Sequence, residues 1–126
     1  MEININCDLG ESSKLHSTEN DTLLLNVVNS ANIACGYHAG DEKTMAKTIE
    51  ISKKNSVSIG AHPSFKDREN FGRKRLNLSH VEIKQLITEQ INVLSEIVVL
   101  LQLLRIARIF RLYFLKLIVF LQNEII

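Results

Sequence analysis

Short runs of apolar residues divide the first 96 residues into strands and helices. Residues 3–7 alternate between apolar and polar side chains, the period of a β-strand, and Asp8 falls at the C-terminal end of that strand. Residues 30–35 and 57–59 are two further short apolar runs, and Gly60 follows the second. The pattern therefore predicts three strands, each followed closely by polar residues and glycine.

Two helices are predicted between these strands. Asp21 is expected to cap a short helix that is rich in leucine and valine, over residues 22–28. Asp41 is expected to cap a longer helix in which Met45 and Ile49 face inward. A lysine pair and an asparagine end that helix, as is common at helix C-termini.

A third and longer helix is predicted after residue 79. Ser79 and Glu82 have the spacing of a capping box, in which the two residues satisfy each other's free backbone amides. The apolar residues that follow fall on one helical stripe: Ile83, Leu86, Ile87, Ile91 and Leu94.

The alternation of strands and helices is typical of an α/β protein with parallel strands. In such folds the loops after the strands gather at one edge, where ligands bind. Three strands are too few to close a barrel of about eight. We therefore expect an α/β fold that holds only the N-terminal strands and helices of an incomplete (β/α) barrel.

The C-terminal segment, residues 97–126, has a composition of its own. It contains 22 apolar residues and no Gly, Pro, Asp, Ser or Thr. Its four cations fall within an arc of about 140° on a helix and interrupt any membrane span of about 20 apolar residues: Arg105, Arg108, Arg111 and Lys116. We expect two regions, residues 1–96 and residues 97–126, with the second helical if ordered.

Three explanations of the C-terminal segment remain open. The first is translation in a shifted reading frame, which the missing turn residues and the change of charge favour. The second is a basic amphipathic helix that binds a membrane surface or a partner. The third is a divergent but genuine segment of the barrel.

Composition narrows the class of protein. The 126 residues carry a net charge of +1, which gives no indication of a nucleic-acid partner. Cys7 and Cys35 form neither a disulfide framework nor a C-x-x-C motif. The polar, acidic N-terminus lacks the features of a signal peptide, so a cytoplasmic protein with reduced thiols is expected.

A pair of carboxylates, Asp8 and Glu11, follows the first predicted strand. Such a pair can supply a metal ligand or a general base, with the second carboxylate tuning the first. The alternative is structural, because an Asx-type hydrogen bond and a carboxylate near a helix start also stabilise turns. The spacing alone leaves both interpretations open.

Two histidines lie near the ends of the second and third strands: His38 in a glycine-bounded loop, and His62 at the end of the third strand, before Pro63. His38 could accept a proton near neutral pH or bind a metal through a neutral nitrogen. Asp41 fits the role of helix cap better than that of catalyst, and it could orient His38 at the same time. Pro63 biases His62 toward an extended conformation at the edge of a pocket, although a structural role is the alternative. Asp8, His38 and His62 together are a candidate set of divalent-metal ligands with an open position for water.

Other polar residues are candidates for binding. Asn6 and Asn32 flank the same predicted edge, where their amides could bind a ligand or satisfy the backbone of the loops. Arg73 could bind a carboxylate or phosphate, or form a surface salt bridge. Cys35 has the spacing of a zinc half-site with His38, and a small buried thiol is the alternative. The sequence contains no phosphate-binding loop of the G-x-x-x-x-G-K type, so any ATP would be held elsewhere.

Five motifs, in order along the chain, resemble the family of 5-oxoprolinase A subunits, also called the LamB/YcsF family. The resemblance extends from about residue 3 to about residue 95, and Gln90 lies where the family usually has a Tyr-Gln pair. The motifs are Asn6-Cys7-Asp8-Leu9-Gly10-Glu11, Ser30-Ala31-Asn32-Ile33-Ala34-Cys35-Gly36, His38-Ala39-Gly40-Asp41, Gly60-Ala61-His62-Pro63 and Phe71-Gly72-Arg73.

The resemblance implies a longer protein with an α/β barrel related to metal-dependent polysaccharide deacetylases. It implies ATP-dependent opening of 5-oxo-L-proline (pyroglutamate) to L-glutamate, together with partner subunits B and C. By this resemblance Asp8, His38 and His62 are expected at the reactive centre. Substrate binding is expected from Asn6, Glu11, Asn32, Asp41 and Arg73.

The chain also departs from the family pattern. Asn70 stands where the family has glycine, and Lys74 stands in place of an arginine. The lysine lacks the planar guanidinium group with which an arginine binds a carboxylate or phosphate through two hydrogen bonds. The motif Lys-Pro-His-Gly-Ala-Leu-Tyr-Asn, which follows the long helix in the family, is absent. We therefore expect a truncated member with little or no activity alone. The other hypotheses are a non-catalytic remnant or module that binds a membrane or partner, and a metal-dependent amide hydrolase or deacetylase.

Overall fold

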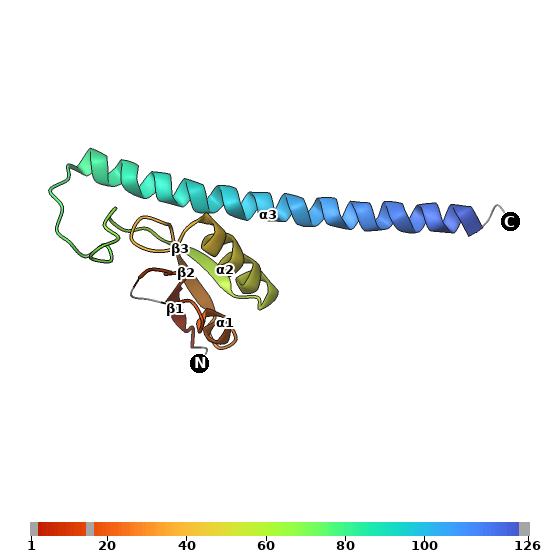
Figure 1. Ribbon diagram of the computed structural model, residues 1–126, viewed down its shortest axis with the longest axis horizontal. Coiled ribbons are helices and arrows are strands. Elements are labelled where there is room, and N and C mark those ends of the chain that lie inside the picture. Colours follow the sequence, from red (N-terminus) through yellow and green to blue (C-terminus); the bar gives the residue numbers. More distant parts are fainter. Residues whose placement is uncertain (1–2, 15–16, 124–126) are drawn as a thin grey trace.

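The computed structural model describes residues 3–14 and 17–123, with side chains up to residue 116. Its elements follow the order β1, α1, β2, α2, β3 and α3 (Figure 1). The strands form one small sheet flanked by α1 and α2, and the long helix α3 lies across them and projects far beyond. The architecture is an α/β fold with a small parallel sheet, as the alternation of elements predicts.

The three strands are parallel and adjacent in chain order: β1 (Asn6–Leu9), β2 (Ser30–Ala34) and β3 (Ser58–His62). In the register of the sheet, Asp8 pairs with Asn32, and Asn32 pairs with Gly60. Ala34 pairs with His62 at the end of β3. The carboxyl ends of the strands therefore share one edge, and the loops that follow them meet there.

Two strand boundaries differ from the prediction. β1 begins at Asn6, and the apolar residues before it, Ile3 and Ile5, are 70% and 52% exposed. The alternation there does not bury a face. The Ile5 amide donates to the Asn29 side chain, and the Ile5 carbonyl accepts from the amides of Asn29 and Ser30 at the start of β2. β3 continues past Gly60 to His62, which is its last residue, so the predicted place of this histidine at the strand end is confirmed.

The short helix α1 (Asp21–Leu24) also differs from the prediction. The prediction that Asp21 caps it is wrong, because the N-cap makes no side-chain hydrogen bond and is a different residue. The Asp21 carboxylate instead accepts a hydrogen bond from the Gly10 amide, at 2.9 Å. Leu25 and Val28, just after the helix, are the residues that enter the core, at 1% and 8% exposed. The Asp21 side chain thus stabilises the turn after β1.

The predicted cap of α2 (Glu42–Lys54) is confirmed. Asp41 Oδ1 accepts a hydrogen bond from the Thr44 amide at 2.7 Å, and this bond lowers the pKa of the Asp41 carboxyl. Met45 and Ile49 are buried, at 1% and 0% exposed, as the helical spacing predicts. They join the core cluster on the sheet, so α2 covers the apolar face of the strands.

Helix α3 (His80–Asn123) begins at the predicted capping box. The Ser79 amide donates to Glu82 Oε2 at 2.8 Å, and the Glu82 amide donates to Ser79 Oγ at 3.3 Å. The predicted apolar stripe is only partly buried: Leu94 is 5% exposed, whereas Ile87 and Ile91 are 38% and 42% exposed. The reason is that α3 packs mainly on a narrow surface formed by α2 and β3.

The two faces of the sheet differ in chemistry because side chains alternate along each strand. Leu9, Ala31 and Ile33 point to one face and are almost completely buried. Asp8 and Asn32 belong to the opposite face, where they are exposed and half-buried respectively. The polar face therefore stays open in this chain, and its edge leads into the loops that carry the predicted site residues.

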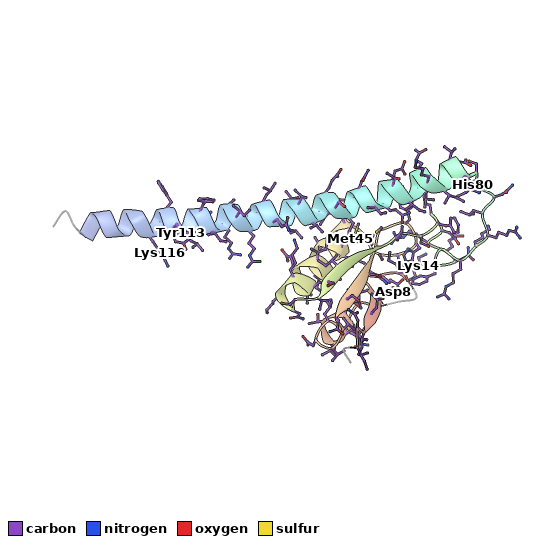
Figure 2. The ribbon with its side chains drawn as sticks, turned by 180° about the vertical axis from the view of Figure 1, so that it is seen from behind. Asp8, Lys14, Met45, His80, Tyr113 and Lys116 are labelled. Atoms are coloured by element: carbon purple, nitrogen blue, oxygen red, sulfur yellow. The ribbon has the colours of Figure 1, made fainter. Side chains whose placement is uncertain are left out.

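The C-terminal half of α3 leaves the rest of the molecule. Its last contacts with the core come from residues 97, 98 and 101, and every residue from 102 to 116 is exposed. Figure 2 shows Tyr113 and Lys116 far from the sheet that carries Asp8. Within the described residues, no helix is long and apolar enough to cross a membrane. The helix is continuous at residue 97, and the division of the chain at residue 96 stays a prediction.

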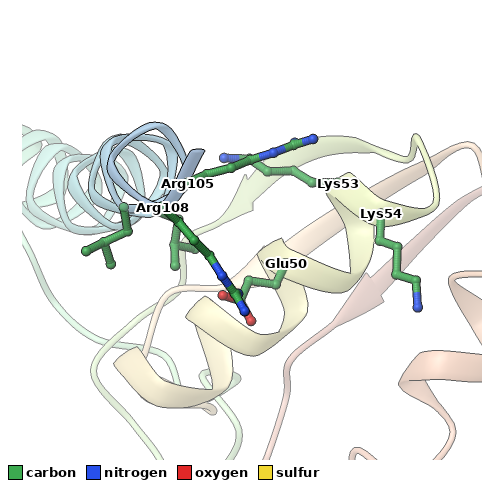
Figure 3. A pocket seen from close by; sticks show the side chains of 7 residues that line it. Glu50, Lys53, Lys54, Arg105 and Arg108 are labelled. Atoms are coloured by element: carbon green, nitrogen blue, oxygen red, sulfur yellow. The ribbon is translucent and has the colours of Figure 1, made fainter. Parts of the chain in front are cut away.

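A basic groove lies where α3 passes α2. Figure 3 shows Arg108 extending from α3 toward Glu50 on α2, with Lys53 and Lys54 on the same helix. Arg105 also lines the groove, and Lys53 Nζ donates to the carbonyl of residue 98 at 3.3 Å. The groove lies on the covered side of the sheet, away from the predicted site residues.

Candidate functional site

A row of hydrogen-bonded polar side chains crosses the open face of the sheet. Asp8 Oδ1 accepts from Asn32 Nδ2 at 3.0 Å, and the same amide donates to Asn6 Oδ1 at 2.7 Å. Asn6 Nδ2 in turn donates to Ser30 Oγ at 2.9 Å. Gly60 gives the row space, because a Cβ there would lie 2.9 Å from Asn32 Oδ1. Three predicted site residues, Asn6, Asp8 and Asn32, are thus brought together.

Two glycine turns bring the loops after β1 and β2 into direct contact. Gly10 and Gly40 have φ values of +73° and +71°, a region that side chains disfavour. The Gly40 amide donates to the Ser12 carbonyl at 2.8 Å, and a Cβ on Gly40 would collide with the Gly10 carbonyl oxygen. This close approach fixes the loop of Glu11 against the loop of His38.

His38 is buried at the centre of the site, only 1% exposed. Its Nε2 lies 3.1 Å from Glu11 Oε1, and its ring makes edge contacts with the rings of His62 (centroids 4.9 Å apart) and Phe71 (5.2 Å). Burial lowers the pKa of the His38 imidazole, although the hydrogen bond with Glu11 opposes this. Its Nδ1 has no hydrogen-bond partner among the residues the structure describes. The geometry therefore favours a neutral imidazole in a fixed orientation.

His62 ends β3 and lies on the rim of the same site. Its Nε2 is 3.2 Å from Glu11 Oε1 and 3.9 Å from Asp8 Oδ2, and its side chain is 32% exposed. The loop after it is held by Gln90 of α3, whose Oε1 accepts from the Ser64 amide at 3.0 Å and whose Nε2 donates to the Ser64 carbonyl at 2.9 Å. His62 is thus the histidine of the site that a ligand from solvent can reach.

The closest group in the site consists of Glu11, His38 and His62, whose three candidate ligand atoms all lie within 4.8 Å of one another. Hereafter we call it the Glu-His-His cluster. The sequence places Asp8 beside the two histidines, whereas the structure places Glu11 between them and Asp8 at its edge. A carboxylate between two imidazoles can exchange protons with them or share a cation with them.

The remaining two predicted site residues lie away from this cluster. Asp41 is exposed and accepts a hydrogen bond from the Thr44 amide as the cap of α2. Arg73 is exposed, and its guanidinium carbon lies 5.4 Å from the centroid of the Phe71 ring. Phe71 also contacts His38, so the Phe71 ring lies between Arg73 and the centre of the site.

Arg68 has a role at the site that sequence reasoning missed. Its two guanidinium nitrogens donate to the carbonyl oxygens of Gly36 and Gly40, at 2.7 and 2.9 Å. These are the two ends of the loop that carries His38, so Arg68 holds that loop closed. No local pattern around residue 68 indicates this role, because both acceptors are backbone atoms about 30 residues earlier.

Cys35 is not part of the Glu-His-His cluster. Its thiol donates to the carbonyl oxygen of Ile33 at 3.3 Å, and burial raises its pKa. Burial therefore disfavours the thiolate that a zinc half-site would need. Of the two interpretations open from the sequence, the small buried thiol fits the structure.

Comparisons with known proteins place the chain among relatives. The model of the LamB/YcsF family matches residues 3–106. Proteins named as the A subunit of 5-oxoprolinase are 46% identical over 95 residues (Staphylococcus epidermidis) and 47% identical over 98 residues (Nitrobacter hamburgensis). These matches cover 75% and 77% of this chain but only 38% of each relative. Because these relatives are named as one subunit, their name implies partner subunits in a complex.

A solved structure gives the same result. A lactam utilization protein from Thermus thermophilus has a TM-score of 0.72 and 35% sequence identity, over 77% of this chain and 39% of that protein. The chain therefore spans about two fifths of the length of the relatives it matches. The family match includes β1, β2 and β3 with all the loops of the Glu-His-His cluster, and it reaches into α3. The chain belongs to the LamB/YcsF family.

Proposed function

We propose that this chain carries the N-terminal part of a 5-oxoprolinase active centre, which converts 5-oxo-L-proline to L-glutamate in an ATP-dependent hydrolysis. The observation that carries the proposal is the convergence of Asp8, Glu11, His38 and His62 at the carboxyl edge of three parallel strands. Support comes from 46% identity to a 5-oxoprolinase A subunit over 95 residues. Partner subunits B and C complete the enzyme in this proposal, which places the reaction in the cytoplasm.

The reaction explains why a carboxylate–histidine site is needed. Hydrolysis breaks the amide C–N bond of the lactam ring: water adds its oxygen to the carbonyl carbon, and the ring nitrogen leaves with a proton. ATP activates the carbonyl, and a second water molecule is consumed as ATP is converted to ADP and phosphate. One proton must therefore leave the attacking water, and one must reach the nitrogen. General bases and acids perform such transfers and contribute about 10²–10⁴-fold each.

The geometry suggests a role for each residue. His62, on the rim, exchanges protons with water or the ring nitrogen, and Glu11 orients it through the 3.2 Å contact. His38 holds Glu11 from the buried side. Asp8 faces the same space, 3.9 Å from His62 Nε2.

The residues around this centre bind the substrate in the proposal. The amides of Asn6 and Asn32, beside Asp8, offer hydrogen bonds to the lactam. Arg73 supplies a cation for the substrate carboxylate, and Asp41 lies at the rim of the loop that carries His38. ATP is held by another part of the complex, because this sequence lacks a phosphate-binding glycine loop.

The open polar face explains the low activity that we expect from the chain alone. Asn6 and Asp8 are exposed, and the matched relatives have more than twice the aligned length. In this proposal the three strands are the first part of an incomplete (β/α) barrel, and further strands would close the polar face. Without these strands the protein would contact the substrate on one side only, so water would not be excluded from the site.

A chimera tests the proposal directly. Residues 3–96 of this chain replace the matching segment of the 5-oxoprolinase A subunit from Staphylococcus epidermidis, and the product is assayed with its subunits B and C for ATP-dependent glutamate formation. We expect the chimera to be active and the isolated chain to form little or no glutamate. His62→Gln in the chimera should lower kcat/KM by about 10² or more, since it removes the proton-transfer group.

The control for that loss is another histidine of the same segment. His80 is exposed at the start of α3, outside the Glu-His-His cluster, so His80→Gln should leave the activity of the chimera unchanged. The proposal fails if a folded chimera is inactive or if His62→Gln is as active as His80→Gln. Glutamate formation by the purified chain alone would refute the expected dependence on the missing part.

A further inference from the structure

Three side-chain atoms at the sheet edge converge on one small volume. Glu11 Oε1 lies 3.1 Å from His38 Nε2 and 3.2 Å from His62 Nε2. Glu11 and His38 come from the loops after β1 and β2, and His62 comes from the end of β3, so the chain brings the three atoms together only through its fold. Both imidazoles thus point their Nε2 atoms at Oε1 of Glu11.

These distances suit a metal ion as well as hydrogen bonds. Two ligand atoms that each lie about 2.1 Å from one tetrahedral metal ion are about 3.4 Å apart. The observed 3.1 and 3.2 Å at the Glu11 oxygen need only a small outward movement to admit an ion, and all three ligand atoms lie within 4.8 Å of one another, which a modest adjustment of the partly exposed His62 side chain can bring to ligand spacing. Two imidazole nitrogens and one carboxylate oxygen are also a common ligand set for zinc and other divalent transition metals, with positions left open for water.

The cluster is held rigidly, which favours a defined coordination geometry. The His38 ring is fixed by edge contacts with two other rings, and Arg68 closes its loop by hydrogen bonds at both ends. The Glu11 loop is tied to the His38 loop by the backbone hydrogen bond between Gly40 and Ser12. His62, with its side chain 32% exposed on the rim, is the most accessible of the three, and the Glu11 side chain is 20% exposed.

The buried Nδ1 of His38 bears on the tautomer that would bind a cation. It has no hydrogen-bond partner among the described residues, and the side chain is 2% exposed. With Nε2 bound to a cation, the proton of the ring would reside on Nδ1.

We propose that Glu11, His38 and His62 bind one divalent transition-metal ion of the zinc class, through Oε1 and the two Nε2 atoms. Asp8, 3.9 Å from His62 Nε2, lies just outside this set, and its other oxygen is occupied by Asn32. The nitrogen ligands select against Mg²⁺ and Ca²⁺, which prefer oxygen. The inference adds a cation to the site of the proposed function, yet it stands on geometry and does not require that reaction.

Metal titration of the full chain tests this proposal without substrate, nucleotide or partner subunits. The chelator-stripped chain is titrated with Zn²⁺ by calorimetry and with Co²⁺ by visible absorption. We expect one equivalent of each ion, d–d bands typical of four- or five-coordinate Co²⁺, and no thiolate charge-transfer band from either cysteine. Excess Mg²⁺ should not displace the bound ion.

Variants identify the ligands. Glu11→Gln keeps the shape and hydrogen-bonding capacity of the side chain but removes its charge, and it should weaken Zn²⁺ binding at least about tenfold. His62→Gln should have a comparable effect, whereas Asp8→Asn should have a smaller one. His80→Gln is the matched control and should leave affinity unchanged. Far-UV circular dichroism verifies that each variant is folded.

The proposal would be overturned by no binding to a folded chain, by equal affinity in Glu11→Gln and the unaltered chain, or by a Co²⁺–thiolate band. A larger loss with Asp8→Asn than with Glu11→Gln would also overturn it, because Asp8 would then be the ligand. Failure here leaves the chimera experiment unaffected, since that assay measures glutamate. An inactive chimera likewise leaves the metal titration valid.

Discussion

The sheet edge and the projecting half of α3 contrast in how their side chains find partners. At the sheet edge, polar groups from three strands satisfy one another over short distances, as with Glu11 between His38 and His62. In residues 102–116 of α3, large apolar side chains such as Phe110 and Tyr113 are 70% and 69% exposed. The polar side chains at the sheet edge have hydrogen-bonding partners that the sequence alone does not reveal. The apolar side chains of residues 102–116 lack the packing partners that so apolar a segment usually has.

The contrast shows which part of the chain folding can stabilise. Burial of apolar surface gives about 25 cal/mol per Å², so exposed leucines and phenylalanines contribute nothing until something covers them. The sheet is stabilised by α2 and by the first half of α3, whose Leu94 is 5% exposed. In the projecting half, residues 102–116 are all exposed even though Arg105 and Arg108 line the groove beside α2, and contiguous exposed apolar surface of this kind promotes association.

The largest effect should come from shortening α3 at two points. A chain ending at residue 102 keeps the packing of Ile97, Val98 and Leu101 on the core, and it should keep its free energy of unfolding. A chain ending at residue 95 loses those three contacts and should be less stable by on the order of 3 kcal/mol. Urea denaturation measures both values.

The same two chains test association. Light scattering should show large species for the full chain and small ones for the chain ending at residue 102. Equal scattering from these two chains would mean that the exposed part of α3 does not drive association. Equal stability of the two shortened chains would contradict the role assigned to residues 97–101.

A single methyl group should give the next largest difference between the two regions. Gly40→Ala places a Cβ against the Gly10 carbonyl at a φ of +71°, and we expect a loss of about 1–3 kcal/mol of stability. Ile106→Ala in the projecting helix removes a much larger group but should cost less than about 0.5 kcal/mol, since Ile106 is 49% exposed. Denaturant midpoints of the two variants measure both losses of stability. A larger loss for Ile106→Ala would show that the projecting helix has a partner.

A smaller effect is expected at the cap of α2, where Asp41 has two predicted roles. Asp41→Ala should cost about 1 kcal/mol by removing the hydrogen bond to the Thr44 amide. Asp41→Asn retains a good capping group and should leave the free energy of unfolding nearly unchanged. In the active chimera, lost activity with Asp41→Asn but unchanged stability would support a role in substrate binding. Full activity with this variant would show that Asp41 serves only as the cap of α2 and does not bind substrate.

A pH dependence of stability should separate the buried histidine from the rest of the chain. Burial lowers the pKa of His38 below its ordinary value of 6.5, so the folded state binds fewer protons there than the unfolded state. The contribution of His38 to the free energy of unfolding is therefore complete above pH 6.5, and it decreases as pH falls through 6.5 toward the pKa of the folded state. Denaturant midpoints of the metal-free chain between about pH 7.5 and 5.5 should therefore decrease, and those of His38→Gln should decrease less. Parallel profiles would contradict a neutral His38.

Several features of the fold follow from local sequence because their causes are local. The Asp41 cap and the Ser79–Glu82 capping box each involve atoms within three residues, and both form as predicted. The inward face of α2, with Met45 and Ile49, also follows from helical periodicity. The three strands and their shared carboxyl edge follow from the alternation of elements.

Other predictions fail where a distant contact decides. Asp21 looks like a helix cap in sequence, but its carboxylate accepts a hydrogen bond from the Gly10 amide, 11 residues earlier. The apolar stripe of α3 includes Ile87 and Ile91, yet the surface that α2 and β3 offer is too narrow to cover them. Periodicity indicates which residues could be buried, whereas the available surface determines which residues are.

The family, the order of the elements and the set of residues at the sheet edge can all be derived from the sequence, because motifs and helix caps depend on neighbouring positions. The three-dimensional contacts were needed to show that Glu11, and not Asp8, lies between His38 and His62, and that Arg68 closes the loop of His38. The reason is that distances between side chains from different strands depend on register and on the turns at Gly10 and Gly40. No local pattern encodes those distances.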